Sequence, residues 1–413
     1  MSGDPNAIVR SRVGTFGRRS FLFGASASLL SACSFIPREP FTAGEQAIAE
    51  VPGIPNARVW VDGSEAEFRS FLRGTVIGSP NGPPESFDIL ALSGGAYDGA
   101  FGAGVVGGWT ATGTRPKFVF VTGVSAGALI APLAFLGPNY DAEMREAFSV
   151  DAAQVLGDLG GIFSLLGTVD LRHGMLENLV DKFVNERLMA SVAAEHAQGR
   201  RLLILTTNLD AQRGVLWDMG AIAAGGPEYR QLFRDVLVAS ASIPGLFGPT
   251  YIEVHANGHF FREMHVDGGA TSQFFVLPDF VYERGKRVAD PRSRPRVWIV
   301  INNHITPQFE VVESGLLPTV SRSFSTLIKS DAKSVLLATF NYVGSNRFNL
   351  TSIDNSFDDW LAANPSIQPG FNSPYMAALY RYGYEKALSG HLWSKQVPLG
   401  AGAPNRFQEV AGR

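Results

Sequence analysis

A serine between two glycines is the feature of this sequence that points most directly to a chemistry. The apolar segment 118–122 leads into Gly-Val-Ser-Ala-Gly at 123–127, and a run of small and apolar residues follows to 136. A strand, a tight turn and a helix in this order form a nucleophile elbow, which holds its serine in a strained backbone conformation. Glycine is needed at Gly123 and Gly127 because a Cβ there would crowd the neighbouring strand or helix. The pattern predicts acyl transfer by Ser125, exposed at the strand end, with the amide of Ala126 at a helix N-terminus as an oxyanion donor.

A second glycine-rich turn precedes the elbow by about thirty residues. A strand expected over 87–92 leads into Ser-Gly-Gly-Ala at 93–96, and a helix rich in glycine and alanine follows over 99–109. This helix can pack close to a sheet, which keeps the amides of Gly94 and Gly95 near the elbow as an anion-receptive loop. A nucleotide-binding turn is the alternative. It is disfavoured because the chain has neither a Gly-x-x-x-x-Gly-Lys-Ser/Thr sequence nor a suitably spaced acidic residue for a ribose.

The third element is a short strand that ends in Asp267-Gly268-Gly269. The flanking glycines let the carboxylate approach another backbone closely. The segment 239–249, Ala-Ser-Ala-Ser-Ile-Pro-Gly-Leu-Phe-Gly-Pro, precedes this strand and predicts a helix end followed by an apolar loop. Leu246 and Phe247 of that loop are candidates for the wall of an acyl pocket.

In this order, the four motifs resemble those of the patatin-like phospholipases, and the resemblance extends from about Phe87 to Asn302. It implies a three-layer α/β fold with a largely parallel central sheet and helices on both faces. It also implies a Ser-Asp dyad in which Ser125 is the nucleophile and Asp267 the proton acceptor. The oxyanion donors would include the amides of Gly94 and Gly95. The substrate would be a lipid or another acyl ester, and no cofactor is implied.

An aspartate that serves as a base requires a special environment. A free carboxylate with a pKa near ~3.9 is a poor proton acceptor for a hydroxyl. We therefore expect burial to raise the pKa of Asp267. The alternative for Asp267 is a turn-forming residue before two glycines.

The first loop departs from the family pattern at two positions. A third glycine is usual at 96 and a basic residue is common at 98, where this chain has Ala96 and Asp98. We expect Asp98 to cap the following helix. Without the positive charge, hydrolysis of carboxylesters or lysophospholipids is as credible as phospholipase A activity.

The N-terminal segment predicts export and lipid attachment. Arg18 and Arg19 precede a short apolar run, 21–30, and Leu-Ser-Ala at 30–32 precedes Cys33, which is the chain's only cysteine. The apolar run is too short to span a bilayer. The segment resembles a twin-arginine signal with a bacterial lipobox, so we expect residues 1–32 to be removed and Cys33 to be lipidated. Ser34 favours delivery to the outer membrane of the cell envelope.

The remaining chain predicts a tether and N-terminal extension over 33–84, a catalytic core over 85–305 and a helical completion of the same domain over 306–413. Strands are expected at 89–92, 118–122, 202–207, 266 and 297–302, and helices at 99–109, 126–136, 174–198, 228–240, 316–342 and 375–388. This alternation is typical of a largely parallel sheet with helices on both faces. The net charge of −3 does not indicate binding to nucleic acid, and the histidines lack metal-ligand spacing.

Two other functions stay open from the sequence. One is a Ser-Asp-His hydrolase, in which His304 or His391 would complete the triad. The other is a catalytically silent lipoprotein that binds acyl chains in the same pocket.

His265 lies two residues from Asp267, on the same strand face, and is expected to make structural hydrogen bonds. The apolar segment 160–167 is either core or a contact for the acyl chain.

Overall fold

The computed structural model describes residues 38–75, 87–151, 169–284, 295–309, 311–312 and 314–398. The chain divides into residues 1–40 and a compact unit of residues 41–413, and the sheet with its helices belongs to the second unit. The predicted signal peptide, Cys33 and the segment 160–167 lie outside the described residues. In the described ranges, none of the helices has both the length and the apolar character needed to cross a bilayer.

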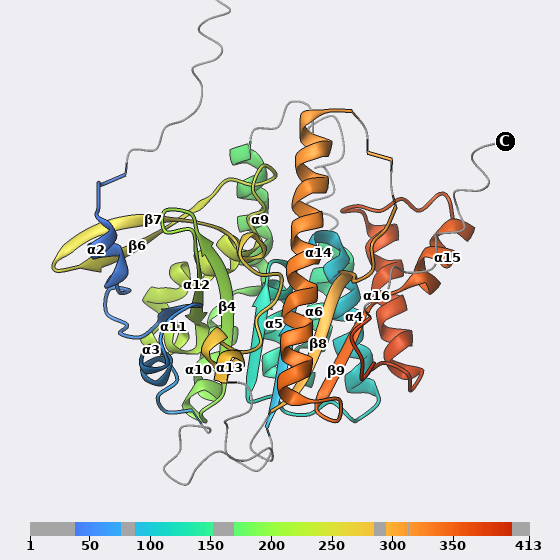
Figure 1. Ribbon diagram of the computed structural model, residues 1–413, viewed down its shortest axis with the longest axis horizontal. Helices are drawn as coiled ribbons and strands as arrows, with labels where there is room; N and C mark the ends of the chain where they lie inside the picture. The colour runs from blue at the N-terminus through green and yellow to red at the C-terminus, as the bar shows by residue number, and fades with distance from the viewer. Residues whose placement is uncertain are drawn as a thin grey trace, which may run out of the picture. The chain divides into compact units, whose positions relative to one another are not determined.

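A nine-stranded sheet, mainly parallel at its centre, forms the middle layer (Figure 1). The order across the sheet is β1 (Arg58–Trp60), β5 (Arg213–Asp218), β4 (Arg201–Asn208), β3 (Phe120–Val124), β2 (Asp88–Leu92), β8 (Arg296–His304) and β9 (Phe348–Ile353). Neighbouring strands in the run β4-β3-β2-β8-β9 pair in parallel. Strands β5 and β1 extend the sheet beyond β4 with antiparallel pairing. The central strands are buried on both faces, which explains their continuous apolar sequences.

A hairpin joins the sheet next to the end of β4. It consists of β6 (Thr250–Ala256) and β7 (His259–Asp267). The last residues of β7 pair antiparallel with β4, where Asp267 lies opposite Thr206. The hairpin therefore brings the Asp-Gly-Gly motif to the carboxyl ends of the parallel strands.

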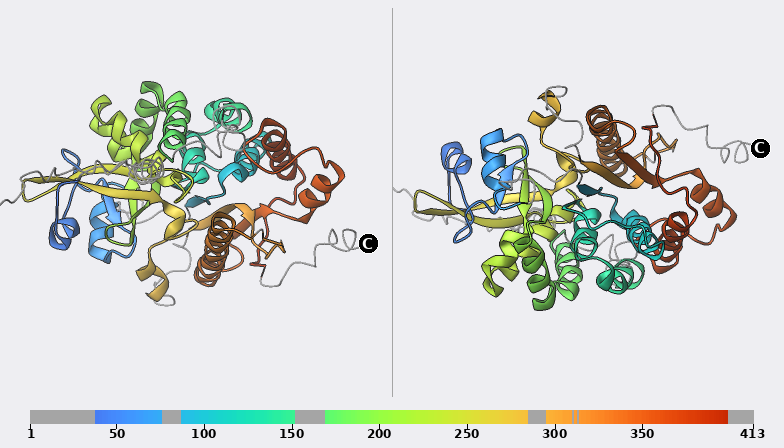
Figure 2. Two further views of the ribbon diagram at one scale, coloured as in Figure 1. Left: turned by 90° about the horizontal axis from the view of Figure 1, so that it is seen from above. Right: turned by 90° about the horizontal axis from the view of Figure 1, so that it is seen from below.

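Helices cover both faces of the sheet, as the sequence predicted (Figure 2). The first face carries α4 (Gly99–Ala111), α5 (Ala126–Leu136), α9 (Val169–Phe183), α10 (Glu186–Ala197), α11 (Met219–Gly225) and α12 (Arg230–Ala241). The second face carries α3 (Glu65–Phe71), α13 (Asp279–Arg284) and α14 (Leu316–Val343). Separate apolar clusters fill the two sides, which confirms a three-layer fold.

The two long helices predicted near the C-terminus pack on different parts of the fold. Helix α14 covers the sheet, packing Ala332 and Leu336 with side chains of β8 and β9. Helix α16 (Ser373–Leu388) packs instead along α4. A Cβ on Gly104 of α4 would collide with the carbonyl oxygen of Tyr380. The small residues of α4 therefore permit a close helix–helix contact as well as a close approach to the sheet.

The sequence predictions of one helix and one strand were wrong. The single helix expected over 174–198 is two helices, because Asn185 caps α10 by accepting a hydrogen bond from the Leu188 amide at 3.0 Å. Strand β9 was not among the predicted strands. It is buried because its side chains meet α14 on one face and because Asn349 donates to the carbonyl of Val297 at 3.0 Å.

Candidate active site

The elbow has the strained geometry that its glycines predicted. Ser125 has φ 55° and ψ −124°, between the end of β3 and the first residue of α5. A Cβ on Gly123 would lie 2.5 Å from the carbonyl oxygen of Gly127, and one on Gly127 would lie 2.6 Å from the carbonyl carbon of Leu92. Ser125 is only 5% exposed, so the expectation of an exposed serine was wrong. The turn presents the hydroxyl to an internal pocket.

Asp267 is buried at the end of β7, beside the elbow. Its amide donates to the carbonyl of Ser242 at 3.0 Å, and its Oδ1 accepts from the amide of Gly269 at 2.7 Å. Its Oδ2 is buried and, among the described residues, has no hydrogen-bond partner. The Ser125 hydroxyl lies close enough to lower the pKa of Asp267, although no hydrogen bond of normal geometry joins the two groups. Such contacts commonly tighten when substrate binds.

Burial raises the pKa of Asp267 to about 7, against the smaller opposing effects of the Ser125 hydroxyl and the Gly269 amide. No charged side chain contributes to this shift. The carboxyl group therefore has the basicity that general base catalysis near neutral pH requires.

The amides predicted as oxyanion donors have different partners. The amide of Gly94 donates to the carbonyl of Gln273 at 3.1 Å, so the assignment of Gly94 as a free donor was wrong. In the described part of the chain, the amides of Gly95, Ala96 and Ala126 make no hydrogen bond. Ala126 begins α5, where the helix dipole favours negative charge. These three amides can therefore receive an oxyanion.

The two departures from the family pattern have structural consequences. Ala96 adopts φ 50°, a conformation that favours glycine. Asp98 stands at the N-cap position of α4 but makes no capping hydrogen bond, so the predicted cap was wrong. Its carboxyl instead accepts from the hydroxyl of Tyr375 at 2.7 Å, and burial raises the pKa of Asp98 to about 6. Asp98 thus connects the loop to α16.

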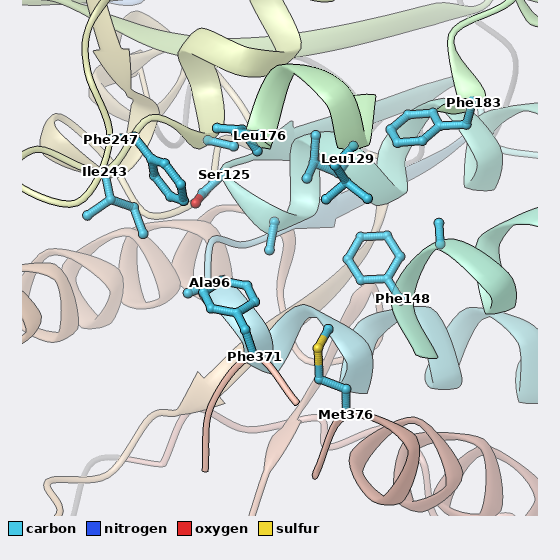
Figure 3. A pocket seen from close by; sticks show the side chains of 14 residues that line it. Ala96, Ser125, Leu129, Phe148, Leu176, Phe183, Ile243, Phe247, Phe371 and Met376 are labelled. Atoms are coloured by element: carbon cyan, nitrogen blue, oxygen red, sulfur yellow. The ribbon is translucent and has the colours of Figure 1, made fainter. Parts of the chain in front are cut away.

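The hydroxyl of Ser125 opens into a narrow apolar pocket (Figure 3). Apart from Ser125, all the described residues that line it are apolar. Ile243 and Phe247 lie next to Ser125, whereas Phe183 lies at the far end, beyond Leu129. Phe247 therefore forms part of the pocket wall, as expected for the loop 244–249, whereas Leu246 does not line the pocket. The shape and composition suit a hydrocarbon chain.

The Ala-Ser-Ala-Ser motif supplies two contacts that the sequence did not reveal. The hydroxyl of Ser240 accepts from the amide of Ser125 at 3.1 Å, and the carbonyl of Ser242 accepts from the amide of Asp267 at 3.0 Å. Both serines lie at the C-terminal end of α12. One helix end therefore holds the backbones of both members of the predicted dyad.

The histidines have partners away from the site. His265 is fully buried between Thr206 and Glu263, at 2.9 Å and 3.2 Å, in the structural role expected for it. His304 lies 3.2 Å from Asp358, and His391 contacts the carbonyl of Ser389. Neither of the last two is found in contact with Ser125 or Asp267 in the described structure, which argues against a Ser-Asp-His triad. Among the described residues, no group of histidine, cysteine and acidic side chains could hold a metal ion.

Comparisons with known proteins give one family match and one structural likeness. The structure aligns with the crystal structure of VipD from Legionella pneumophila at 13% identity and a TM-score of 0.39, covering 74% of this chain and 66%, slightly less than two thirds, of that chain. No curated protein sequence matches significantly. The family model of the patatin-like phospholipases matches residues 90–279, which include the elbow, the Gly94–Ala96 loop and the Asp-Gly-Gly motif. Residues 90–279 therefore match the patatin-like phospholipase domain that the motifs predicted.

Proposed function

We propose that this protein is a serine acyl hydrolase that cleaves carboxylic esters of lipids through a Ser125–Asp267 dyad. The observation that carries the proposal is the meeting of three features at one point. The strained serine, a buried carboxyl with a pKa of about 7 and three amides without a partner among the described residues lie beside the elbow, where Ser125, Ala96 and Ala126 line an apolar pocket. Together they supply the nucleophile, base and oxyanion site that acyl transfer needs.

Acylation follows from these positions. The Ser125 oxygen attacks the ester carbonyl carbon while its proton passes to Oδ2 of Asp267, the oxygen that has no hydrogen-bond partner among the described residues. The negative charge that develops on the carbonyl oxygen is stabilised by the amides of Ala126, Gly95 and Ala96. The tetrahedral intermediate then collapses: the bond between the carbonyl carbon and the alcohol oxygen breaks, the protonated Asp267 gives its proton to the leaving alcohol, and the acyl group stays on Ser125.

Deacylation repeats the steps with water. Asp267 accepts a proton from the water that attacks the acyl-enzyme, and the resulting tetrahedral intermediate collapses to release a fatty acid and restore the Ser125 hydroxyl. The wholly apolar lining around Ser125 favours a hydrocarbon acyl group over a polar one. Lysophospholipids, diacyl phospholipids and simple lipid esters all present such a group.

We also propose that the protein is exported and held at the bacterial cell envelope through a lipidated Cys33. The support is the paired arginines, the short apolar run and the position of the sole cysteine. Mass spectrometry of the mature N-terminus tests this directly. A diacylglyceryl-modified Cys33 is expected, and an unprocessed or unmodified N-terminus would contradict it.

The test of function is release of fatty acid by a purified soluble form that starts after Cys33. The substrates are mixed micelles of phosphatidylcholine, lysophosphatidylcholine or monoacylglycerol. Turnover by wild type that is lost in Ser125→Ala supports the proposal. Retention of labelled lipid without release of fatty acid would favour the silent lipid-binding alternative.

A further inference from the structure

Asn302 of β8 is a fully buried residue whose polar groups meet the loop that carries the oxyanion amides. Its backbone amide donates to Oγ of Ser93 at 2.8 Å, and its Nδ2 donates to the carbonyl of Ser93 at 2.7 Å. The Ser93 hydroxyl in turn donates to the carbonyl of Gly94 at 2.8 Å. One residue of β8 thus holds both the main-chain and the side-chain oxygen of Ser93.

The same residue also limits where the next part of the loop can lie. The backbone of Gly95 packs so closely on Asn302 that a Cβ on Gly95 would lie 2.6 Å from the Cβ of Asn302. On its other side, Oδ1 of Asn302 faces Gly102 of α4 and makes no hydrogen bond within the described structure. The side chain is therefore enclosed between the loop and α4, and it keeps this place although one buried acceptor is unsatisfied.

We propose that Asn302 is a positioning residue for the oxyanion site: through Ser93 it fixes the amides of Gly95 and Ala96 relative to Ser125. This inference rests on the proposed function. Asn302 does not line the pocket, so it acts through the loop and not on the substrate.

The physical reason is that an oxyanion site works by preorganisation. Its donors must lie 2.7–3.1 Å from the place where the charge develops, and removing one donor lowers kcat by ~100- to 1,000-fold in other enzymes. Gly95 has no side chain to anchor it, and Ala96 is in a conformation that its Cβ disfavours. Without Asn302, we expect the loop to leave its strained position.

The experiment compares Asn302→Ala with Asn349→Ala. Asn349 is a matched control because it is also a buried asparagine on the adjacent strand, and its Nδ2 donates to the carbonyl of Val297 instead of to the loop. For Asn302→Ala we expect kcat for a p-nitrophenyl acyl ester to fall ~10- to 100-fold, with KM changed less than about threefold. Asn349→Ala should keep the wild-type kcat. Thermal unfolding of both variants measures their structural cost.

Ser93→Ala provides a second test that leaves Asn302 in place. It removes the hydroxyl that accepts from the backbone amide of Asn302 and donates to the carbonyl of Gly94, two contacts that Asn302→Ala retains. We therefore expect kcat to fall with KM unchanged, and the double variant to fall at least as far as Asn302→Ala alone. If Asn302→Ala does not fold, the effect of Ser93→Ala on kcat decides.

The inference is overturned if kcat in Asn302→Ala matches that of Asn349→Ala, or if only KM changes. An unchanged kcat in Ser93→Ala also overturns it. Failure of the proposed function gives a different result. In that case the wild type would hydrolyse the ester no faster than Ser125→Ala in the same assay, and both proposals would be wrong.

Discussion

The backbone amide of Ser125 donates a hydrogen bond to the hydroxyl of Ser240, at 3.1 Å. The same hydroxyl donates to the carbonyl of Leu205 on β4, at 2.6 Å. A single buried side chain at the end of α12 therefore connects the nucleophile's backbone to the neighbouring strand. This connection opposes relaxation of the strained φ of Ser125.

Replacing Ser240 should impair catalysis as well as stability. In Ser240→Ala, the Leu205 carbonyl and the Ser125 amide lose their partner, at an expected cost of ~1–3 kcal/mol in the free energy of unfolding. A small displacement of the nucleophile should lower kcat by ~10- to 100-fold. Denaturant unfolding and steady-state kinetics check both effects.

The control for this prediction is Thr339→Val. Thr339 is also fully buried, and its hydroxyl pairs with that of Tyr282 at 2.9 Å on the second face of the sheet. This variant should lose stability but keep the wild-type kcat. Equal kcat in Ser240→Ala and Thr339→Val would show that the Ser240 contact is structural only.

Activity should depend on the ionisation of Asp267. Because the carboxyl accepts a proton only when it is ionised, and its pKa is about 7, kcat/KM should rise about tenfold per pH unit below pH 7 and level off above it. A pH–rate profile on an uncharged soluble ester measures this. Asp98→Asn is the control, because Asp98 is another buried acid near the loop with a raised pKa, and its replacement should leave the acidic limb of the profile in place. Full activity at pH 5 would be incompatible with Asp267 as the base.

The same shift predicts how stability changes with pH. The pKa of Asp267 rises from its ordinary value of 3.8 to about 7 on folding, so between these values the folded protein holds a proton that the unfolded chain has released. The contribution of Asp267 to the free energy of unfolding is therefore fully present below pH 4 and is lost as the pH rises through 7. The loss is about 1.4 kcal/mol for each pH unit of the window.

The asparagine in Asp267→Asn does not titrate, so the free energy of unfolding of this variant should increase relative to wild type as the pH is raised from 5 to 8. Urea unfolding of both proteins at pH 5 and pH 8 gives the difference in free energy of unfolding at each pH. An identical difference at pH 5 and pH 8 would mean that Asp267 ionises with an ordinary pKa.

The depth of the pocket should set the preferred acyl chain. Phe183 lies at the end away from Ser125 (Figure 3), so Phe183→Trp should shift the preference to shorter chains and Phe183→Ala to longer ones. We expect the ratio of kcat/KM between long and short esters to change by ~10-fold or more, measured from p-nitrophenyl butyrate to palmitate. Phe280→Ala, which removes a partly buried ring packed on Phe68 outside the pocket, should leave the ratio unchanged. Equal ratios in all four proteins would place the acyl chain elsewhere.

The sequence predicted those parts of the site that depend on local backbone chemistry. Ser125 needs glycines on both sides of its turn, and Asp267 needs glycines after it, so short motifs record both. The central parallel strands were predictable because burial on both faces requires continuous apolar runs.

The contacts that hold the site together could not be predicted in this way. Ser240 lies 115 residues from Ser125, Asn302 lies 209 residues from Ser93, and Tyr375 lies 277 residues from Asp98. These partners meet only because of the order of the strands and the packing of α16 on α4. The partner of the Gly94 amide, the carbonyl of Gln273, likewise follows from tertiary structure.

The most direct test of the account is covalent labelling with a fluorophosphonate probe, which reacts with activated serines. Wild type, Ser125→Ala and Asp267→Asn are compared in the soluble form, with thermal unfolding to verify that each is folded. Wild type should be labelled at Ser125, and Ser125→Ala should not be labelled. The labelling rate of Asp267→Asn should be at least ~100-fold lower than that of wild type. A folded wild type that is not labelled, or labelling that persists in Asp267→Asn, would contradict a Ser125–Asp267 dyad.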